Sequence, residues 1–99
     1  MSAVFSTEAR EDLIAAIFYY DERSPGLGDR FEAAVFEATR RIGAAPDAWP
    51  RIDGDARFFR VDGFPYALVY FLNAPEQPVV VAVFELHQDP EKLRGRLRS

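Results

Sequence analysis

Two almost unbroken apolar runs, residues 68–72 and 79–86, lie close together in the second half of this chain of 99 residues. A strand with one face in water alternates apolar and polar side chains, and neither run does so. Both runs are therefore expected to form strands that are covered on both faces. A chain of this length has room for one core, so we expect a layer of helices on one face and a different cover on the other.

The first half of the chain supplies the helices. We expect a short strand in "SAVF" (residues 2–5) and then a helix capped by Ser6 or Thr7. The apolar stripe of this helix consists of Ala9, Leu13, Ala16, Ile17 and Tyr20. "SPGLG" ends it, and a second helix is expected from about residue 27 to 45. The stripe of the second helix consists of Phe31, Val35, Ala38 and Ile42. Because the link between them is short, the two helices are expected to form an antiparallel hairpin.

The second half of the chain is expected to form a β meander after a loop over residues 46–55. Its strands are predicted at residues 56–61, 66–72 and 79–86, with Asp62-Gly63 as a type I′ hairpin turn between the first two. Alternate side chains of the middle strand point to opposite faces of the sheet, and both sets are apolar or aromatic. This pattern predicts two covered faces, but it does not say which face lies under the helices.

A last short helix is expected near the C-terminal end, with Asp89 as its cap and Pro90 at its first position. Leu93 and Leu97 would lie on one side of this helix. The predicted fold is a single α+β domain over residues 1–99, in the order β-α-α-β-β-β-(α). Its sheet is expected to be antiparallel, with the helix hairpin on one face.

Charge and composition narrow the function classes. The net charge of −4 is unfavourable for gripping nucleic acid, although the C-terminal end is locally basic, with Lys92, Arg94, Arg96 and Arg98. This basic stretch is either a solvated end of the chain or a contact surface for an anionic partner. The chain has no cysteine, which suits a reducing cytoplasm, and no apolar run is long enough for a membrane span.

Few residues can carry chemistry. His87 is the only histidine, and a lone histidine at a strand end is either an acid–base group or an ordinary surface residue. Glu85 is expected to share a face with it and to pair with it. Arg57 and Arg60 should point to opposite faces of their strand, either for function or to keep an edge strand from aggregating. The catalytic candidates are therefore Arg57, Arg60, Tyr70 and His87, without a complete catalytic set, and no metal or cofactor site is expected.

Four segments, in this order, resemble the RelE/ParE superfamily of bacterial toxins from type II toxin–antitoxin modules. They are "FSTEAREDLIAAIFYYDE", "LGDRFEAAVFEATRRIGAAPDAWP", "RFFRVDGFPYALVYFL" and "VVVAVFELHQDP". Each motif is unspecific by itself, but the four together span nearly the whole chain. The helix segments look closer to the ParE branch. The last segment departs from the superfamily pattern: Glu85 stands where a histidine is common, and His87 and Gln88 stand where an arginine is usual.

The resemblance implies a toxin that binds DNA gyrase without being a nuclease and is neutralised by an antitoxin, with which it forms a hetero-oligomer. The alternatives are a RelE-like, ribosome-dependent mRNA endoribonuclease, or a decayed member that only binds its antitoxin. The resemblance also places the first short strand beside the last. The second sheet face would be covered by the antitoxin, by the chain's own last helix or by a second copy. Contact candidates for the target or antitoxin are Tyr66, Leu68, Tyr70, Lys92, Leu93, Arg94, Arg96, Leu97 and Arg98.

Overall fold

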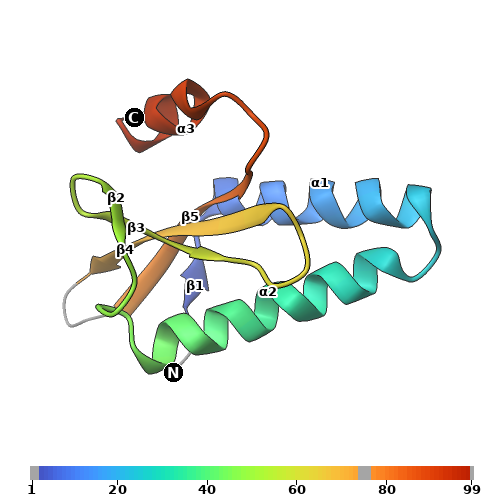
Figure 1. Ribbon diagram of the computed structural model, residues 1–99, viewed down its shortest axis with the longest axis horizontal. Helices are drawn as coiled ribbons and strands as arrows, with labels where there is room; N and C mark the ends of the chain where they lie inside the picture. Colours follow the sequence, from blue (N-terminus) through green and yellow to red (C-terminus); the bar gives the residue numbers. More distant parts are fainter. Residues whose placement is uncertain (1–2, 74–76, 99) are drawn as a thin grey trace.

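The computed structural model describes residues 3–73 and 77–98, and its elements follow the predicted order with one strand added (Figure 1). Its strands are β1 (Val4–Phe5), β2 (Arg51–Asp53), β3 (Ala56–Arg60), β4 (Tyr66–Asn73) and β5 (Gln77–Glu85). Its helices are α1 (Thr7–Arg23), α2 (Leu27–Ala44) and α3 (Pro90–Leu97). The α+β fold class is therefore confirmed, with β2 lying where a loop was expected.

The strands form one five-stranded sheet in the order β1-β5-β4-β3-β2. Neighbours from β2 to β5 run antiparallel, as predicted for the meander. Strand β1 pairs in parallel with β5, with Val4 opposite Val79. The first strand thus lies beside the last, as expected, but the sheet is mixed and not purely antiparallel.

The connection between β3 and β4 lies where it was predicted, but it is not a two-residue turn. The N–H of Val61 donates to the carbonyl of Tyr66 at 2.9 Å, so four residues separate the paired positions. Gly63 within this connection has φ of 80°, a left-handed conformation that favours glycine. The Asp62-Gly63 pair therefore marks the turn correctly but does not form a two-residue type I′ hairpin.

The helix hairpin closes tightly at Gly28. The carboxylate of Asp21 on α1 accepts a hydrogen bond from the N–H of Gly28 at 2.7 Å. A Cβ at this position would lie 2.5 Å from the carbonyl oxygen of Ile17 and 2.6 Å from the Asp21 carboxyl carbon. Only a glycine therefore fits between the two helices here.

Gly28→Ala is expected to lower the free energy of unfolding by about 1–3 kcal/mol, because the added methyl group must push the helices apart. Urea denaturation, monitored by circular dichroism, measures the free energy of unfolding. Gly95→Ala on α3 is the matched control, because a Cβ there meets no atom within 4 Å and alanine favours a helix. Equal losses of stability in the two variants would contradict the tight helix contact.

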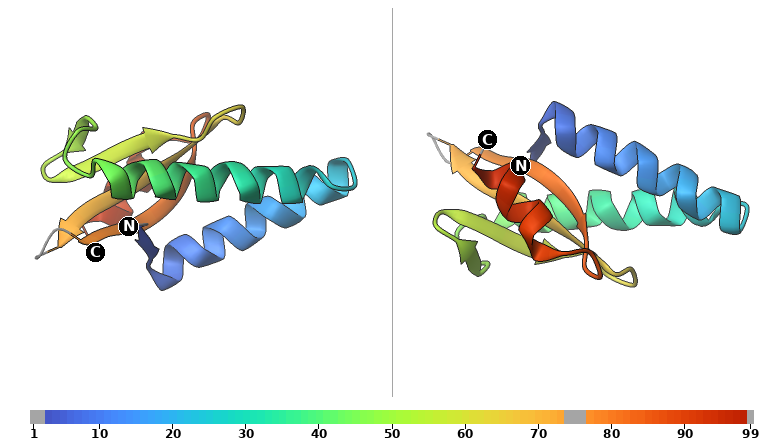
Figure 2. Two further views of the ribbon diagram at one scale, coloured as in Figure 1. Left: turned by 90° about the horizontal axis from the view of Figure 1, so that it is seen from below. Right: turned by 90° about the horizontal axis from the view of Figure 1, so that it is seen from above.

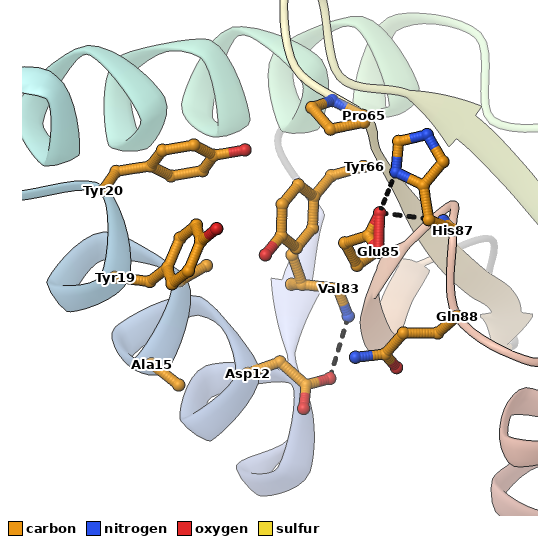
Figure 3. Close-up of a pocket in the computed structure, with 11 residues that line it drawn as sticks. Asp12, Ala15, Tyr19, Tyr20, Pro65, Tyr66, Val83, Glu85, His87 and Gln88 are labelled. Carbon is orange, nitrogen blue, oxygen red and sulfur yellow. Dashed lines mark hydrogen bonds and ion pairs between the residues drawn. The ribbon is translucent and has the colours of Figure 1, made fainter. Parts of the chain in front are cut away.

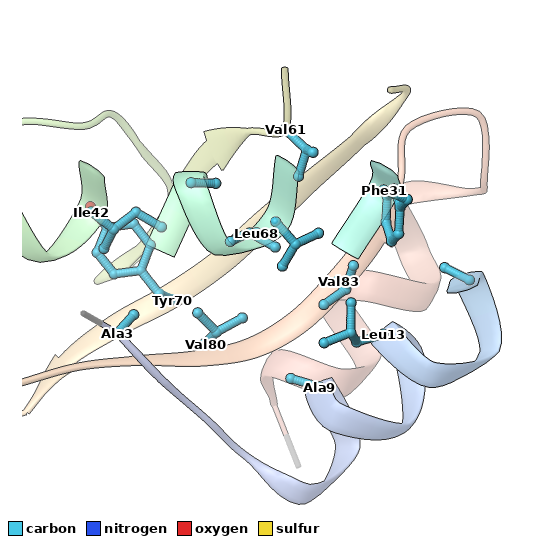
Figure 4. Packing of buried hydrophobic residues seen from close by; sticks show 13 residues of the cluster. Ala3, Ala9, Leu13, Phe31, Ile42, Val61, Leu68, Tyr70, Val80 and Val83 are labelled. Atoms are coloured by element: carbon cyan, nitrogen blue, oxygen red, sulfur yellow. The ribbon is translucent and has the colours of Figure 1, made fainter. Parts of the chain in front are cut away.

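The main core lies between the helix hairpin and one face of the sheet (Figures 2 and 4). Phe31, Val35 and Ile42 of α2 are fully buried, which confirms the predicted stripe. The sheet residues that meet the hairpin include Leu68, Tyr70, Val80 and Val83.

The second face of the sheet is covered in part by α3, which crosses it on the side opposite the hairpin (Figure 2). Ala56, Val69 and Ala82 are buried there, and Leu93 and Leu97 of α3 pack against them. The larger side chains of this face, Phe58, Phe71 and Phe84, remain only half-buried. The chain's own last helix is therefore one answer to what covers this face, and it leaves part of the face open to another molecule.

Candidate functional site

The end of β5 and the turn that follows it place Glu85, His87 and Gln88 beside α1. The N–H of Leu86 donates to the carbonyl of Pro65 at 2.9 Å, and that of Gln88 donates to the carbonyl of Glu85 at 3.1 Å, which turns the chain sharply. Asp89 then caps α3 as predicted, accepting from the N–H of Glu91 at 3.0 Å. These bonds hold the polar residues at the edge of the sheet.

An open pocket of about 530 Å³ lies between this segment, α1 and the start of β4 (Figure 3). The side chains of Tyr19 and Tyr20 on α1 point toward Tyr66 on β4, and Glu85 lies beside Tyr66 in the sheet register. The complete lining is Asp12, Ala15, Ala16, Tyr19, Tyr20, Pro65, Tyr66, Val83, Glu85, His87 and Gln88. The pocket thus combines aromatic walls with carboxylate, hydroxyl and imidazole groups.

Glu85 and His87 form the predicted pair. The imidazole Nδ1 lies 2.7 Å from Oε1 of Glu85, and the backbone N–H of His87 donates to the same oxygen at 2.8 Å. The His87 side chain is 81% exposed, whereas that of Glu85 is only 22% exposed. The carboxylate therefore forms part of the pocket wall, and the imidazole lies on the solvent side of the pocket.

Two tyrosines of the pocket, Tyr20 and Tyr66, are held in the neutral form. Burial, followed by the proximity of Tyr20 and Glu85, raises the pKa of Tyr66 to about 12. Burial, together with Tyr19 and Glu85, also raises the pKa of Tyr20. The ring centroids of Tyr20 and Tyr66 are 6.1 Å apart, and both rings pack against Phe31. At neutral pH this wall therefore offers hydroxyl groups and aromatic faces, not phenolates.

Two of the four catalytic candidates serve structure at the far end of the sheet. The Arg57 guanidinium donates to the carbonyls of Trp49 at 2.6 Å and Asp47 at 3.1 Å. The Tyr70 hydroxyl donates to the carbonyl of Pro46 at 2.6 Å. Both residues fasten the loop after α2. Tyr70 lies four strand residues from Tyr66, about 13 Å along β4, so this pair is remote from the pocket.

The remaining two candidates are not brought together either. Arg60 is exposed and shares the sheet face of Phe58, opposite the face on which Tyr66 and Glu85 lie. No hydrogen bond or ion pair joins Arg60 to another residue of the described chain. His87 therefore has Glu85 as its polar partner and no arginine from β3 within its surroundings.

The basic α3 is fixed to α1 through one of its arginines. Arg96 donates to both oxygens of Asp12, at 2.5 and 3.2 Å, and also to the carbonyl of Val81 at 3.3 Å. The Asp12 carboxylate also accepts a hydrogen bond from the N–H of Val83 at 3.0 Å. The bond with Asp12 also raises the pKa of Arg96. Asp12 thus joins α1, β5 and α3 at a single carboxylate.

The predicted contact residues divide by exposure. Leu68 and Tyr70 are fully buried beneath the helix hairpin, so both are wrong as surface contacts for a partner that docks on this fold. Tyr66 lines the pocket, and Leu93 and Leu97 are engaged with the second sheet face. Arg96 is held by Asp12, and Arg94 pairs with Glu91 on the same helix. Lys92, Arg94 and Arg98 have exposed side chains.

Sequence reasoning did not identify Asp12, Tyr19 or Tyr20 as site residues. Tyr20 appeared only in the apolar stripe of the first helix, and Tyr19 only within the motif quoted for that helix. Asp12 looked like one of many surface carboxylates, because its partner Arg96 lies 84 residues away in the chain. Within the described residues, no three His or acidic side chains cluster as metal ligands would. The helices in that part of the chain are also too short or too polar to cross a membrane.

Comparisons with known proteins agree with this fold. Among curated protein sequences, none matches the chain. A solved structure described as a chromosomal ParDE TA system from P. aeruginosa superposes with a TM-score of 0.75, at 14% sequence identity. The match covers 88% of this chain and 97% of that one, and it shows a shared fold.

A family model gives the identity. The model of the ParE toxin of the type II toxin–antitoxin system parDE matches residues 3–96. This match confirms the resemblance drawn from the four sequence motifs, including the choice of the ParE branch. The chain therefore belongs to the ParE toxin family of type II toxin–antitoxin systems.

Proposed function

We propose that this chain is a toxin that inhibits DNA gyrase by binding to it, and that a cognate antitoxin neutralises it by binding in turn. Membership of the ParE family supports this proposal. The observation that carries it is the polar set around His87, which lacks the positive charge that phosphate chemistry requires.

A nuclease must stabilise negative charge on the phosphate in the transition state, usually with arginine or lysine. In the described pocket, His87 is bonded to Glu85, whose negative charge opposes that task. Arg96 is committed to Asp12, and Arg57 is committed to the loop after α2. The pocket is therefore poorly suited to RNA cleavage, and inhibition by protein binding fits better.

The second sheet face supports a role for an antitoxin. Phe58, Phe71 and Phe84 remain half-buried beside α3. An apolar segment of a partner can remove these rings from water, which contributes about 25 cal/mol per Å² of buried apolar surface. We therefore place the antitoxin contact beside α3 and on it, and the complex is a hetero-oligomer.

A supercoiling assay tests the proposed target. The purified chain is expected to block supercoiling of relaxed plasmid by gyrase, and prior addition of the antitoxin encoded beside it is expected to restore supercoiling. Translation extracts programmed with messenger RNA provide the second arm. Intact messenger RNA in that extract agrees with the proposal. Cleavage on the ribosome, with gyrase unaffected, would replace the gyrase proposal with the endoribonuclease.

A further inference from the structure

The pocket beside α1 presents hydrogen-bond acceptors that the described residues leave unused. Both contacts from His87 are made to Oε1 of Glu85, and no described residue bonds to Oε2. The hydroxyl groups of Tyr20 and Tyr66 likewise form no hydrogen bond with another described residue. Neither hydroxyl is sealed from solvent, because Trp49 Nε1 is the only buried side-chain polar atom without a partner in the described chain.

The charges around the pocket identify Glu85 as the group that remains available. The Asp12 carboxylate is already occupied by Arg96 and by the N–H of Val83. Arg23 lies over the Tyr19 ring, with its guanidinium carbon 4.5 Å from the ring centroid. An entering group therefore meets the free oxygen of Glu85 and the rings of Tyr20 and Tyr66, while the Tyr19 face is taken.

We propose that this pocket receives the guanidinium group of an arginine side chain carried by a partner protein. A carboxylate favours a cation, and neutral tyrosines supply hydroxyl acceptors and aromatic faces on which a flat cation packs. A guanidinium group is planar and carries five N–H donors, so it suits several separate acceptors better than a lysine ammonium does. Arg23 on Tyr19 is an example of the same contact at the pocket rim.

This inference rests on the proposed function only in taking the partner to be a protein. Three of the chain's own arginines are already engaged elsewhere or lie too far away. Arg60 lies on the opposite face of the sheet, Arg96 is bound to Asp12, and Arg23 packs on the ring of Tyr19 at the rim. We therefore take the arginine to come from another chain.

An NMR titration of the purified chain with N-acetyl-arginine methylamide tests the pocket directly. The amide signals of Tyr66 and Gln88 are expected to shift and saturate. The citrulline analogue, which has the same shape without the charge, is expected to leave them unmoved. The lysine analogue is expected to bind more weakly than the arginine probe.

Two variants complete the test. Glu85→Gln is expected to weaken binding of the arginine probe at least about tenfold, because it removes the charge and keeps the shape. Glu37→Gln on α2, far from the pocket, is the matched control and is expected to leave binding unchanged. Equal shifts with citrulline, equal binding of lysine, or unchanged affinity in Glu85→Gln would overturn the proposal. Gyrase takes no part in this titration, so failure of the gyrase proposal would not affect its result.

Discussion

Replacing the exposed cations at the C-terminal end, Lys92, Arg94 and Arg98, with glutamine is expected to abolish growth inhibition, whereas His87→Ala is expected to leave it intact. The proposed inhibition of gyrase works through a contact surface, and Lys92 and Arg94 on α3, with Arg98 directly after it, form an exposed basic surface. The imidazole of His87 lacks a cationic partner for phosphate chemistry, so its loss removes no catalytic step. Colony counts after induction in a bacterial host without the antitoxin measure both variants.

The triple substitution is sharper than removal of the helix. Truncation after Pro90 is also expected to abolish toxicity, but it uncovers the buried second face and can unfold the chain. The triple variant keeps Leu93, Leu97 and Arg96, which hold α3 in place. A matched control replaces Arg10, Arg30 and Arg40 with glutamine, which changes the net charge equally.

The control triple also removes one exposed ion pair, Arg40 with Glu37, just as the α3 triple removes Arg94 with Glu91. Loss of toxicity in both triples would indicate an effect of net charge and not of the α3 surface. Loss of toxicity in a folded His87→Ala variant, with messenger RNA cleaved only by the parent chain, would establish the nuclease instead.

Phe31→Ala is expected to lower the free energy of unfolding by about 3–5 kcal/mol, a large share of the stability of a domain of this size. The Phe31 ring is fully buried and packs against Tyr20, Phe64 and Tyr66, with centroids 4.9 to 5.1 Å away. Its removal leaves a cavity between the helix hairpin and the sheet. Urea denaturation of the purified variants measures the loss.

Phe36→Ala is the matched control, because Phe36 belongs to the same helix but is 53% exposed. Its substitution is expected to change the free energy of unfolding by no more than about 0.5 kcal/mol. A similar loss in both variants would mean that the outer face of α2 is also packed, in an assembly of chains in solution.

The helices and the central strands could be predicted from the sequence because their patterns are long. The stripe from Phe31 to Ile42 repeats over three turns. The two apolar runs are too hydrophobic for the surface, so in a small chain they are expected as strands covered on both faces. Strand β2 could not be found in this way. Its three residues, Arg51 to Asp53, are all exposed, and they become a strand only because β3 offers them a pairing edge.

The candidate site was predictable only where its contacts are local. Glu85 and His87 are two residues apart, so their pairing needs only local backbone geometry, although β5 ends at Glu85 and His87 lies in the turn that follows. Asp12 and Arg96 meet through the tertiary fold, and nothing near either residue in the sequence reveals the other. Leu68 and Tyr70 were assigned to the wrong surroundings because both faces of β4 are apolar. Alternation separates the two faces of such a strand but does not show which one the helices cover.

The pairing of β1 with β5 means that the sheet can be completed only late in synthesis. The helix hairpin leaves the ribosome before the strands that cover it, and about 40 residues separate the end of α2 from the end of β5. At bacterial elongation rates this interval lasts roughly 2–8 s, during which the apolar stripes of α1 and α2 are open to chaperones. Strand β1 cannot pair during this interval either, since Val79, the partner of Val4, emerges late. A neutralising partner that recognises the finished sheet can therefore bind only after β5 has emerged, so capture of the nascent toxin follows its folding.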